Sequence, residues 1–133
     1  MNRFFYIARV RIKQREDQGK EYFGRGVADL LHGVEEYRSL NLAAQHMGMA
    51  YSKAWRIVRQ AEVALGLQLL YRMRKNGSRL TDEGRTMLKA YEEAEQAAWE
   101  AADAVMEKYF GGEKNGQDQK STGAKPGNAG DGF

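Results

Sequence analysis

The sequence predicts a mainly α-helical fold with one small β-hairpin and a long C-terminal helix. Apolar residues recur at helical spacing through several segments between residues 25 and 110. The dipeptide Asn76-Gly77 stands between two short strand-like runs, which is a strong hairpin signal because these residues accept positive φ angles. From Thr81 to Phe110 a heptad-like spacing of apolar residues favours a helix about 45 Å long.

Length and composition exclude several classes of protein. The chain has 133 residues, the length of one domain with a tail, and it contains no cysteine. Disulfides, thiolate metal sites and cysteine nucleophiles are therefore excluded, and with two histidines neither a metal site nor a cofactor is predicted. No apolar run approaches the roughly 18 residues of a membrane span, and the first residues do not resemble a secretory signal. We therefore expect a cytoplasmic protein.

Residues 4–13 alternate between apolar and polar side chains, which predicts a β-strand with one wet, basic face. The two sides of this strand would hold Tyr6, Ala8, Val10 and Ile12 on one side and Arg9, Arg11 and Lys13 on the other. After a polar turn, Tyr22 and Phe23 are expected to form a short return strand.

Two short helices are predicted next. The first begins at Arg25 and ends near Glu36, and it has one apolar face. The apolar positions of this face are Val27, Leu30, Leu31 and Val34. Ser39 is a plausible N-cap for the second helix, Leu40 to Met47, and Gly48 suits the left-handed residue that ends it.

A third helix is predicted from Tyr51 to Leu65, closed by Gly66. Its buried stripe, at spacings of four, three and four, consists of Ala54, Val58, Ala61 and Leu65. The opposite face carries hydroxyl and cationic side chains, namely Ser52, Arg56 and Arg59, with Lys53 and Trp55 beside them.

Strand-like runs at residues 69–74 and 79–81 flank the Asn76-Gly77 turn, and Thr81 is expected to cap the long helix. This helix carries a seam of mostly small apolar residues: Met87, Tyr91, Ala94, Ala98, Ala101 and Val105. The helix could fold back on its own domain as a lid, but so small a domain cannot bury the whole seam, and we therefore expect a homodimer through this helix. The glycine-rich residues 111–133 are predicted to be a disordered tail. The expected organisation is a domain over residues 1–80, a dimerisation helix over 81–110 and a tail over 111–133.

Positive charge is concentrated in one block of the chain. Residues 50–80 carry seven Lys or Arg and one Glu, a net charge of +6, whereas residues 81–110 carry three cations and eight acids, a net charge of −5. A basic patch of this kind favours an anionic polymer as partner. A solvated surface with scattered salt bridges is an equally good interpretation of the charge alone.

Two helices joined by a tight turn and followed by a basic hairpin are typical of a winged helix-turn-helix, whose second helix lies in the major groove of double-stranded DNA. The residues predicted to read or clamp that groove are Ser52, Lys53, Arg56 and Arg59. Phosphates or the adjacent minor groove are the predicted targets of the hairpin residues Arg74, Lys75, Asn76 and Arg79. Ser39 and Asn41, at the start of the second helix, would offer backbone amides to a phosphate.

Two aromatic residues, Tyr51 and Trp55, lie on or near the predicted DNA-binding face. Trp55 either packs on the sugar–phosphate backbone or a thymine methyl group, or it covers the hydrophobic joint between the helices. The sequence favours neither role over the other.

The run from Asn41 to Arg56, NLAAQHMGMAYSKAWR, resembles the helix-turn-helix of ModE, the molybdate-responsive regulator. Residues 65–70 and 80–85 resemble wing-flanking segments shared by ModE and LysR-type regulators, and residues 9–12 resemble part of the ModE N-terminal domain. The resemblance implies a bacterial or archaeal transcription regulator with a winged helix-turn-helix, dimerised through helices that flank it. The effector domain of these families is not expected after Phe110, so no oxyanion site is transferred.

Other functions stay open. An isolated winged helix could be a protein–protein interaction module, for an RNA polymerase subunit or an effector-sensing partner, or it could bind DNA without sequence preference. An enzyme is not expected: Asp29 and His32 could meet on the first helix, but neither a nucleophile–base set nor a phosphate-binding loop accompanies them. The sequence favours a sequence-specific DNA-binding transcription regulator that binds an inverted-repeat operator as a homodimer.

Overall fold

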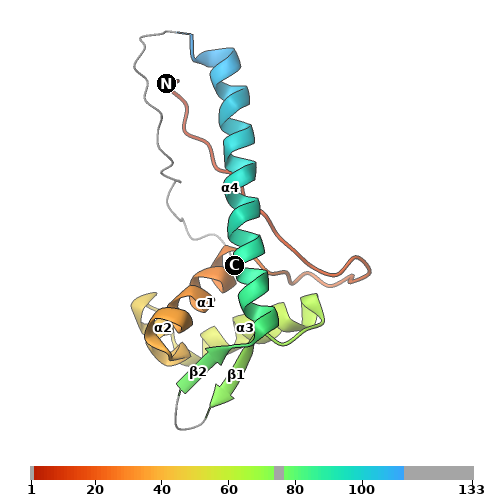
Figure 1. The fold of residues 1–133 in the computed structure, drawn as a ribbon, viewed down its shortest axis with the longest axis vertical. Coiled ribbons are helices and arrows are strands. Elements are labelled where there is room, and N and C mark those ends of the chain that lie inside the picture. Colours follow the sequence, from red (N-terminus) through yellow and green to blue (C-terminus); the bar gives the residue numbers. More distant parts are fainter. Residues whose placement is uncertain (1, 74–76, 113–133) are drawn as a thin grey trace.

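A computed structural model describes residues 2–73 and 77–112 of the chain. Its elements, in chain order, are α1 (Arg25–Tyr37), α2 (Leu40–His46), α3 (Tyr51–Leu65), β1 (Leu70–Met73), β2 (Gly77–Leu80) and α4 (Asp82–Phe110). The first three helices and the hairpin form one body, and α4 extends far beyond it, as Figure 1 shows. The predicted fold class, a mainly α-helical winged helix-turn-helix with a long C-terminal helix, is confirmed.

The core lies where α1, α2 and α3 meet under the hairpin. The predicted apolar faces of α1 and α3 are buried, with Leu30 and Val58 completely inaccessible to solvent. Small residues allow close packing at the α1–α2 contact, because a Cβ atom at Gly33 would lie 2.6 Å from the Cβ of Ala43. Short helices are only marginally stable in isolation. Burial of these apolar faces by the hydrophobic effect therefore holds the three helices together.

Capping residues place the helix ends where the sequence predicts them. The Ser39 hydroxyl accepts a hydrogen bond from Leu42 N at 3.1 Å and so caps α2. Gly48 and Gly66 have φ angles of 71° and 73°, the left-handed conformation expected after α2 and α3. Arg38 ends α1 in the same conformation although it is not glycine, with φ of 59°, and its carbonyl accepts a hydrogen bond from Ser78 N.

The hairpin is antiparallel and pairs Leu70 with Leu80. Directly after it, the Thr81 hydroxyl accepts a hydrogen bond from Gly84 N at 2.8 Å and donates one to Gln68 O at 2.6 Å, which fixes the first turn of α4 to the chain before β1. Gly84 lies so close to this chain that a Cβ atom there would be 2.3 Å from the Leu69 carbonyl oxygen. The first turn of α4 therefore packs directly against the backbone of Leu69.

The N-terminal segment is not the strand that its alternation predicts. Residues 2–13 contain no strand, and a single bridge joins Ile12 to Phe23. A longer ladder cannot form because the residue after Phe23, Gly24, is the N-cap of α1, and the helix begins at Arg25. The segment lies extended along α4 instead (Figure 1), and Arg9, predicted on the wet face, contacts the buried Glu95.

Side chains tie this N-terminal segment to α4 over much of its length. Tyr6 stacks on Trp99 with ring centroids 6.5 Å apart, and its hydroxyl donates to Asp103. Asn2 donates from its side chain to Glu107 at 2.8 Å. The side chains of Tyr6, Ala8, Val10 and Ile12 are all half-buried, but so are Arg9 and Lys13 of the predicted wet face, so the alternation does not separate an inner from an outer face here.

The predicted seam of α4 is divided between two environments. Tyr91 is buried in the domain and Met87 packs against the core. The later seam residues, Ala94, Ala101 and Val105, are exposed, and Ala98 is half-buried. Together with Ala90, Ala97 and Ala104 they form an alanine-rich face, which turns away from both the domain and the N-terminal segment.

Gly84 provides a test of the contact between α4 and the chain before β1. Ala is more favourable than Gly within a helix by about 1 kcal/mol, so local propensity predicts that Gly84→Ala stabilises the protein. Packing predicts the opposite, because the new Cβ meets the Leu69 carbonyl. We expect Gly84→Ala to unfold at a lower temperature by circular dichroism, and Gly112→Ala, whose new Cβ meets nothing within 4 Å, to be unchanged. An equal or higher melting temperature for Gly84→Ala would contradict the contact.

Candidate nucleic-acid interface

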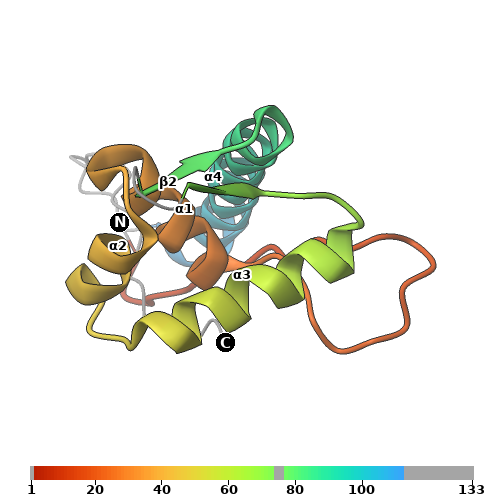
Figure 2. The same ribbon diagram turned by 90° about the horizontal axis from the view of Figure 1, so that it is seen from below.

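The polar face of α3 is open to solvent. Ser52, Lys53, Arg56 and Arg59 are all exposed, as the sequence predicts, while Ala54, Val58 and Ala61 on the other side of the helix are completely buried. Seen from below, α3 runs across the surface of the domain on the side opposite the far end of α4 (Figures 1 and 2). The helix therefore presents hydroxyl and cationic groups along a convex, accessible ridge.

Tyr51 and Trp55 form an aromatic pair at the start of α3. The indole N–H of Trp55 donates to the Tyr51 hydroxyl at 2.8 Å, one helical turn away. Tyr51 is about half exposed, whereas Trp55 is half-buried and packs against the core. Trp55 thus packs against the core and holds Tyr51 on the exposed side.

At the start of α2, two backbone amides already have hydrogen-bond partners within the protein. Leu42 N is bonded to the Ser39 hydroxyl, and Leu40 N lies 3.4 Å from the Ser78 hydroxyl of β2. Asn41 is exposed between them. The N-cap of α3, Ala50, has no side-chain cap, and within the first turn of this helix Lys53 N donates to Ala50 O at 3.1 Å.

The hairpin contributes Arg79 to the same region. Arg79 is exposed on β2 and stands opposite Tyr71 of β1, which is also exposed. Arg38, at the α1–α2 turn, is exposed where its carbonyl meets β2. Sequence reasoning named neither Tyr71 nor Arg38, although the basic residue directly before the Ser39 cap was a usable signal. The other three predicted hairpin residues, Arg74, Lys75 and Asn76, lie outside the described residues.

Glu62 connects α3 to the hairpin. Its carboxylate accepts hydrogen bonds from Leu69 N at 2.8 Å and Leu70 N at 3.3 Å, and its other oxygen lies 3.8 Å from the guanidinium of Arg59. Arg59 is two-thirds exposed, so this ion pair leaves most of its charge facing solvent. The only acid of the basic block thus positions β1 relative to α3.

Asp29 and His32 of α1 contact different partners in the described structure. Asp29 contacts Arg25 at 3.3 Å, and burial raises the pKa of its carboxyl group despite that cation. His32 contacts Glu92 of α4 at 3.4 Å rather than Asp29. Among the described residues, no group of His, Asp and Glu could hold a metal ion. No described helix combines the length and apolar character needed to cross a membrane.

Residues 29–85 match a family model described as the bacterial regulatory helix-turn-helix protein, lysR family. The match runs from the middle of α1 to the first turn of α4 and covers a little under half of the chain. A comparison with curated proteins found no match. The part of the chain that holds α2, α3 and the hairpin is therefore similar to the DNA-binding domain of LysR-type regulators.

The cap of α2 supports a prediction on stability. Ser39→Ala removes the acceptor for Leu42 N, and loss of such a cap costs about 1 kcal/mol. We expect Ser39→Ala to lower the free energy of unfolding in urea by about that amount. Ser39→Asp, which retains a capping oxygen, should stay close to the parent. Equal stability of Ser39→Ala and the parent protein would show that the cap contributes nothing.

Proposed function

We propose that the protein is a transcription regulator that binds DNA sequence-specifically, as a homodimer on an inverted repeat. The observation that carries the proposal is the exposed polar and cationic face of α3, directly opposite a completely buried stripe, inside the segment similar to LysR-type DNA-binding domains. A single helix fits the major groove, which is about 12 Å wide. The resemblance of residues 41–56 to ModE supports the same assignment.

In this proposal each part of the surface has a distinct role. Arg56 and Lys53 reach base edges, where a bidentate Arg–guanine contact discriminates most strongly. Ser52 and Arg59 clamp the groove beside them. Arg79 and Arg38 neutralise phosphates on the flanking backbone, which sets register and affinity rather than sequence preference.

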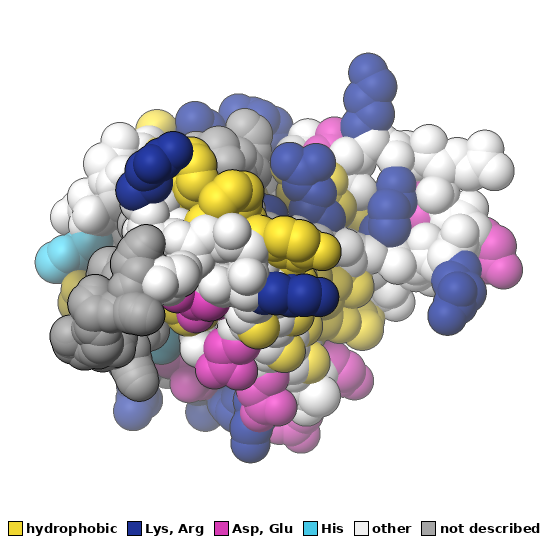
Figure 3. Space-filling model, turned by 90° about the horizontal axis from the view of Figure 1, so that it is seen from above, with side chains coloured by type: hydrophobic (Ala, Val, Ile, Leu, Met, Phe, Trp, Pro, Cys, Tyr) yellow, Lys and Arg dark blue, Asp and Glu magenta, His cyan; other side chains and the backbone are white. Residues whose placement is uncertain are grey.

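The alanine-rich face of α4 supports the proposed homodimer. Ala94, Ala101 and Val105 are exposed on a helix that has already left its own domain. Figure 3 shows hydrophobic side chains lying together on the molecule seen from above, the side toward which α4 extends. Exposed large hydrophobic residues occur in the last turns of α4, namely Val105, Tyr109 and Phe110, and in the N-terminal segment, namely Phe4, Phe5 and Ile7. A two-fold partner buries such a surface and places two α3 helices on one DNA duplex.

Selection of bound duplexes from a random DNA library, at two salt concentrations, tests the proposal as a whole. We expect enrichment of a palindromic site and a steep loss of affinity with salt. Binding without an enriched sequence would instead indicate a nonspecific DNA-binding protein. Failure of the folded protein to bind any duplex would indicate a protein–protein interaction module, for example for an effector-sensing partner.

Arg56→Ala tests base reading. If Arg56 contacts a guanine bidentately, its loss costs about 1–3 kcal/mol at the selected site and relaxes the preference at one base pair. Fluorescence anisotropy with the selected duplex and with single-base variants measures both effects. Arg3→Ala is the matched control, because Arg3 is exposed near the far end of α4, beside Asn2, which contacts Glu107. Unchanged affinity and preference in Arg56→Ala would remove Arg56 from the reading set.

Ala101→Glu tests the dimer. The substitution places a charge in the alanine-rich face, where pairing would bury it without a partner, so the protein should become monomeric. Gln96→Glu adds the same charge on the polar side of α4, where Gln96 donates to Glu100, and should leave the assembly unchanged. Light scattering of both variants gives the mass. An Ala101→Glu protein with the parent's dimeric mass would exclude this face as the interface.

A further inference from the structure

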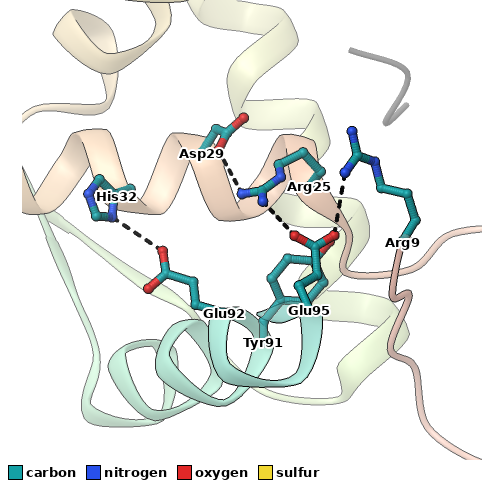
Figure 4. Close-up of polar contacts among 7 residues, drawn as sticks. All are labelled: Arg9, Arg25, Asp29, His32, Tyr91, Glu92 and Glu95. Atoms are coloured by element: carbon teal, nitrogen blue, oxygen red, sulfur yellow. Dashed lines mark hydrogen bonds and ion pairs between the residues drawn. The ribbon is translucent and has the colours of Figure 1, made fainter. Parts of the chain in front are cut away.

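A buried carboxylate joins the three segments that meet where α4 leaves the domain. Glu95 of α4 is 1% exposed, and its carboxylate lies 2.5 Å from the Arg25 guanidinium of α1. The Tyr91 hydroxyl, one turn earlier in α4, donates to the same carboxylate at 2.8 Å. Arg9 of the N-terminal segment approaches it to 3.8 Å. Figure 4 shows both guanidinium groups and the phenol directed at this one carboxylate.

Glu95 is also the last buried residue of α4. The buried residues of this helix are Gly84, Leu88, Tyr91 and Glu95. Beyond Glu95, the described side-chain contacts of α4 with other segments are with the N-terminal segment. Tyr6 contacts Trp99 and Asp103, Phe4 contacts Phe110, and Asn2 contacts Glu107. The direction of the far half of the helix is therefore set at Glu95 and by the contacts of the N-terminal segment with this half.

The hydrogen bonds and ion pairs to Glu95 can hold the three segments in one arrangement. Burial and the neighbouring carboxylate raise the pKa of Tyr91, so the phenol remains a proton donor to Glu95 at physiological pH. Charge-assisted hydrogen bonds of this kind are short and directional, and a buried carboxylate that loses a partner cannot turn to water instead. Alternative directions of α4 are therefore unfavourable while the cluster is intact.

A small change of direction at Glu95 becomes a large displacement at the end of α4. The helix continues for roughly 22 Å from Glu95 to Phe110, at about 1.5 Å per residue. A tilt of about 10° moves its end by roughly 4 Å over that length. Since the rise of B-DNA is about 3.4 Å per base pair, such a tilt corresponds to about one base pair of half-site spacing.

We propose that Glu95 is a positioning residue that fixes the direction of α4 relative to α3 and thereby the half-site spacing that the dimer accepts. The consequence for DNA depends on the proposed function, because it requires a dimer through α4. The direction of α4 within one chain does not require a dimer. Its measurement therefore tests the role of Glu95 independently of DNA.

The chain supplies its own matched control. Glu92 of α4 also makes an ion pair with α1, to His32 at 3.4 Å, but His32 is 65% and Glu92 44% exposed. An exposed pair contributes little, because water competes for both partners. Glu95→Gln and Glu92→Gln therefore make the same chemical change between the same two helices, one in the buried cluster and one at the surface.

The first experiment measures the distance from α3 to the far end of α4 by pulsed electron paramagnetic resonance. The chain has no cysteine, so Val63→Cys on α3 and Lys108→Cys on α4, both exposed, accept spin labels without further changes. Labelled chains are diluted with unlabelled chains, so that distances within one protomer dominate. We expect Glu95→Gln to shift or broaden the distance distribution by about 4 Å, the displacement of a 10° tilt, and Glu92→Gln to leave it unchanged.

If Glu95→Gln does not fold, the same distance is measured in Arg9→Met. The Nε and one terminal nitrogen of Arg9 are buried without a hydrogen-bond partner in the described structure, so an apolar side chain of similar length fits there. It removes one cation from Glu95 and the contact of Arg9 with α4, and it should also broaden the distribution. An unchanged distribution in the folded variant, Glu95→Gln or failing that Arg9→Met, would overturn the proposal.

The second experiment measures affinity for two selected half-sites whose separation is changed one base pair at a time. We expect the parent and Glu92→Gln to prefer one spacing, and Glu95→Gln to accept neighbouring spacings while its affinity for a single half-site is retained. A general loss of stability would lower all affinities together and leave the preference intact. An unchanged spacing preference beside a broadened distance distribution would overturn the link to DNA. If the parent binds no duplex, the proposed function fails, and the distance measurement still decides the role of Glu95.

Discussion

The burial of one stripe of α3 fixes the rotation of that helix about its own axis, and the remaining surface depends on this rotation. Ala54, Val58 and Ala61 have no exposed area, and their small side chains let the helix lie close against α1 and α2. At 100° per residue, Ser52, Arg56 and Arg59 then stand on the opposite side. None of these side chains has to be desolvated for the domain to fold, because the apolar stripe alone provides the packing.

The long helix α4 has three faces, and each meets a different environment. One face packs on the domain and then on the N-terminal segment, through a row of residues spaced by four: Glu95, Trp99, Asp103 and Glu107. An extended chain from Asn2 to Arg9 spans roughly 23 Å and the helix from Glu95 to Glu107 roughly 18 Å, so the two lengths are compatible. A second face carries Lys89, Glu93 and Glu100, all exposed. The N-terminal segment thus covers a polar row and leaves the alanine-rich face open.

Much of the fold could be predicted, because its signals are local. Helical spacing gave the inward residues of α1 and α3, Ser39 and Thr81 marked the starts of α2 and α4, and Gly48 and Gly66 marked ends. The exposure of the candidate site on α3 followed from the same spacing. The roles of Glu62, Arg38 and Tyr71 could not be predicted in this way. Each depends on which backbone or side chain, distant in sequence, lies beside it.

Sequence by itself determined the helices, their inward faces, the hairpin and the cationic ridge of α3, because periodicity and capping act within a few residues. Only the tertiary structure decided the course of residues 2–13 and the partner of Arg9. An alternating segment becomes a strand only if another strand can bond to it, and here the chain after Phe23 is already helical. A buried carboxylate such as Glu95 needs cations, and packing alone brings Arg9 and Arg25, from separate parts of the chain, to the same side of α4.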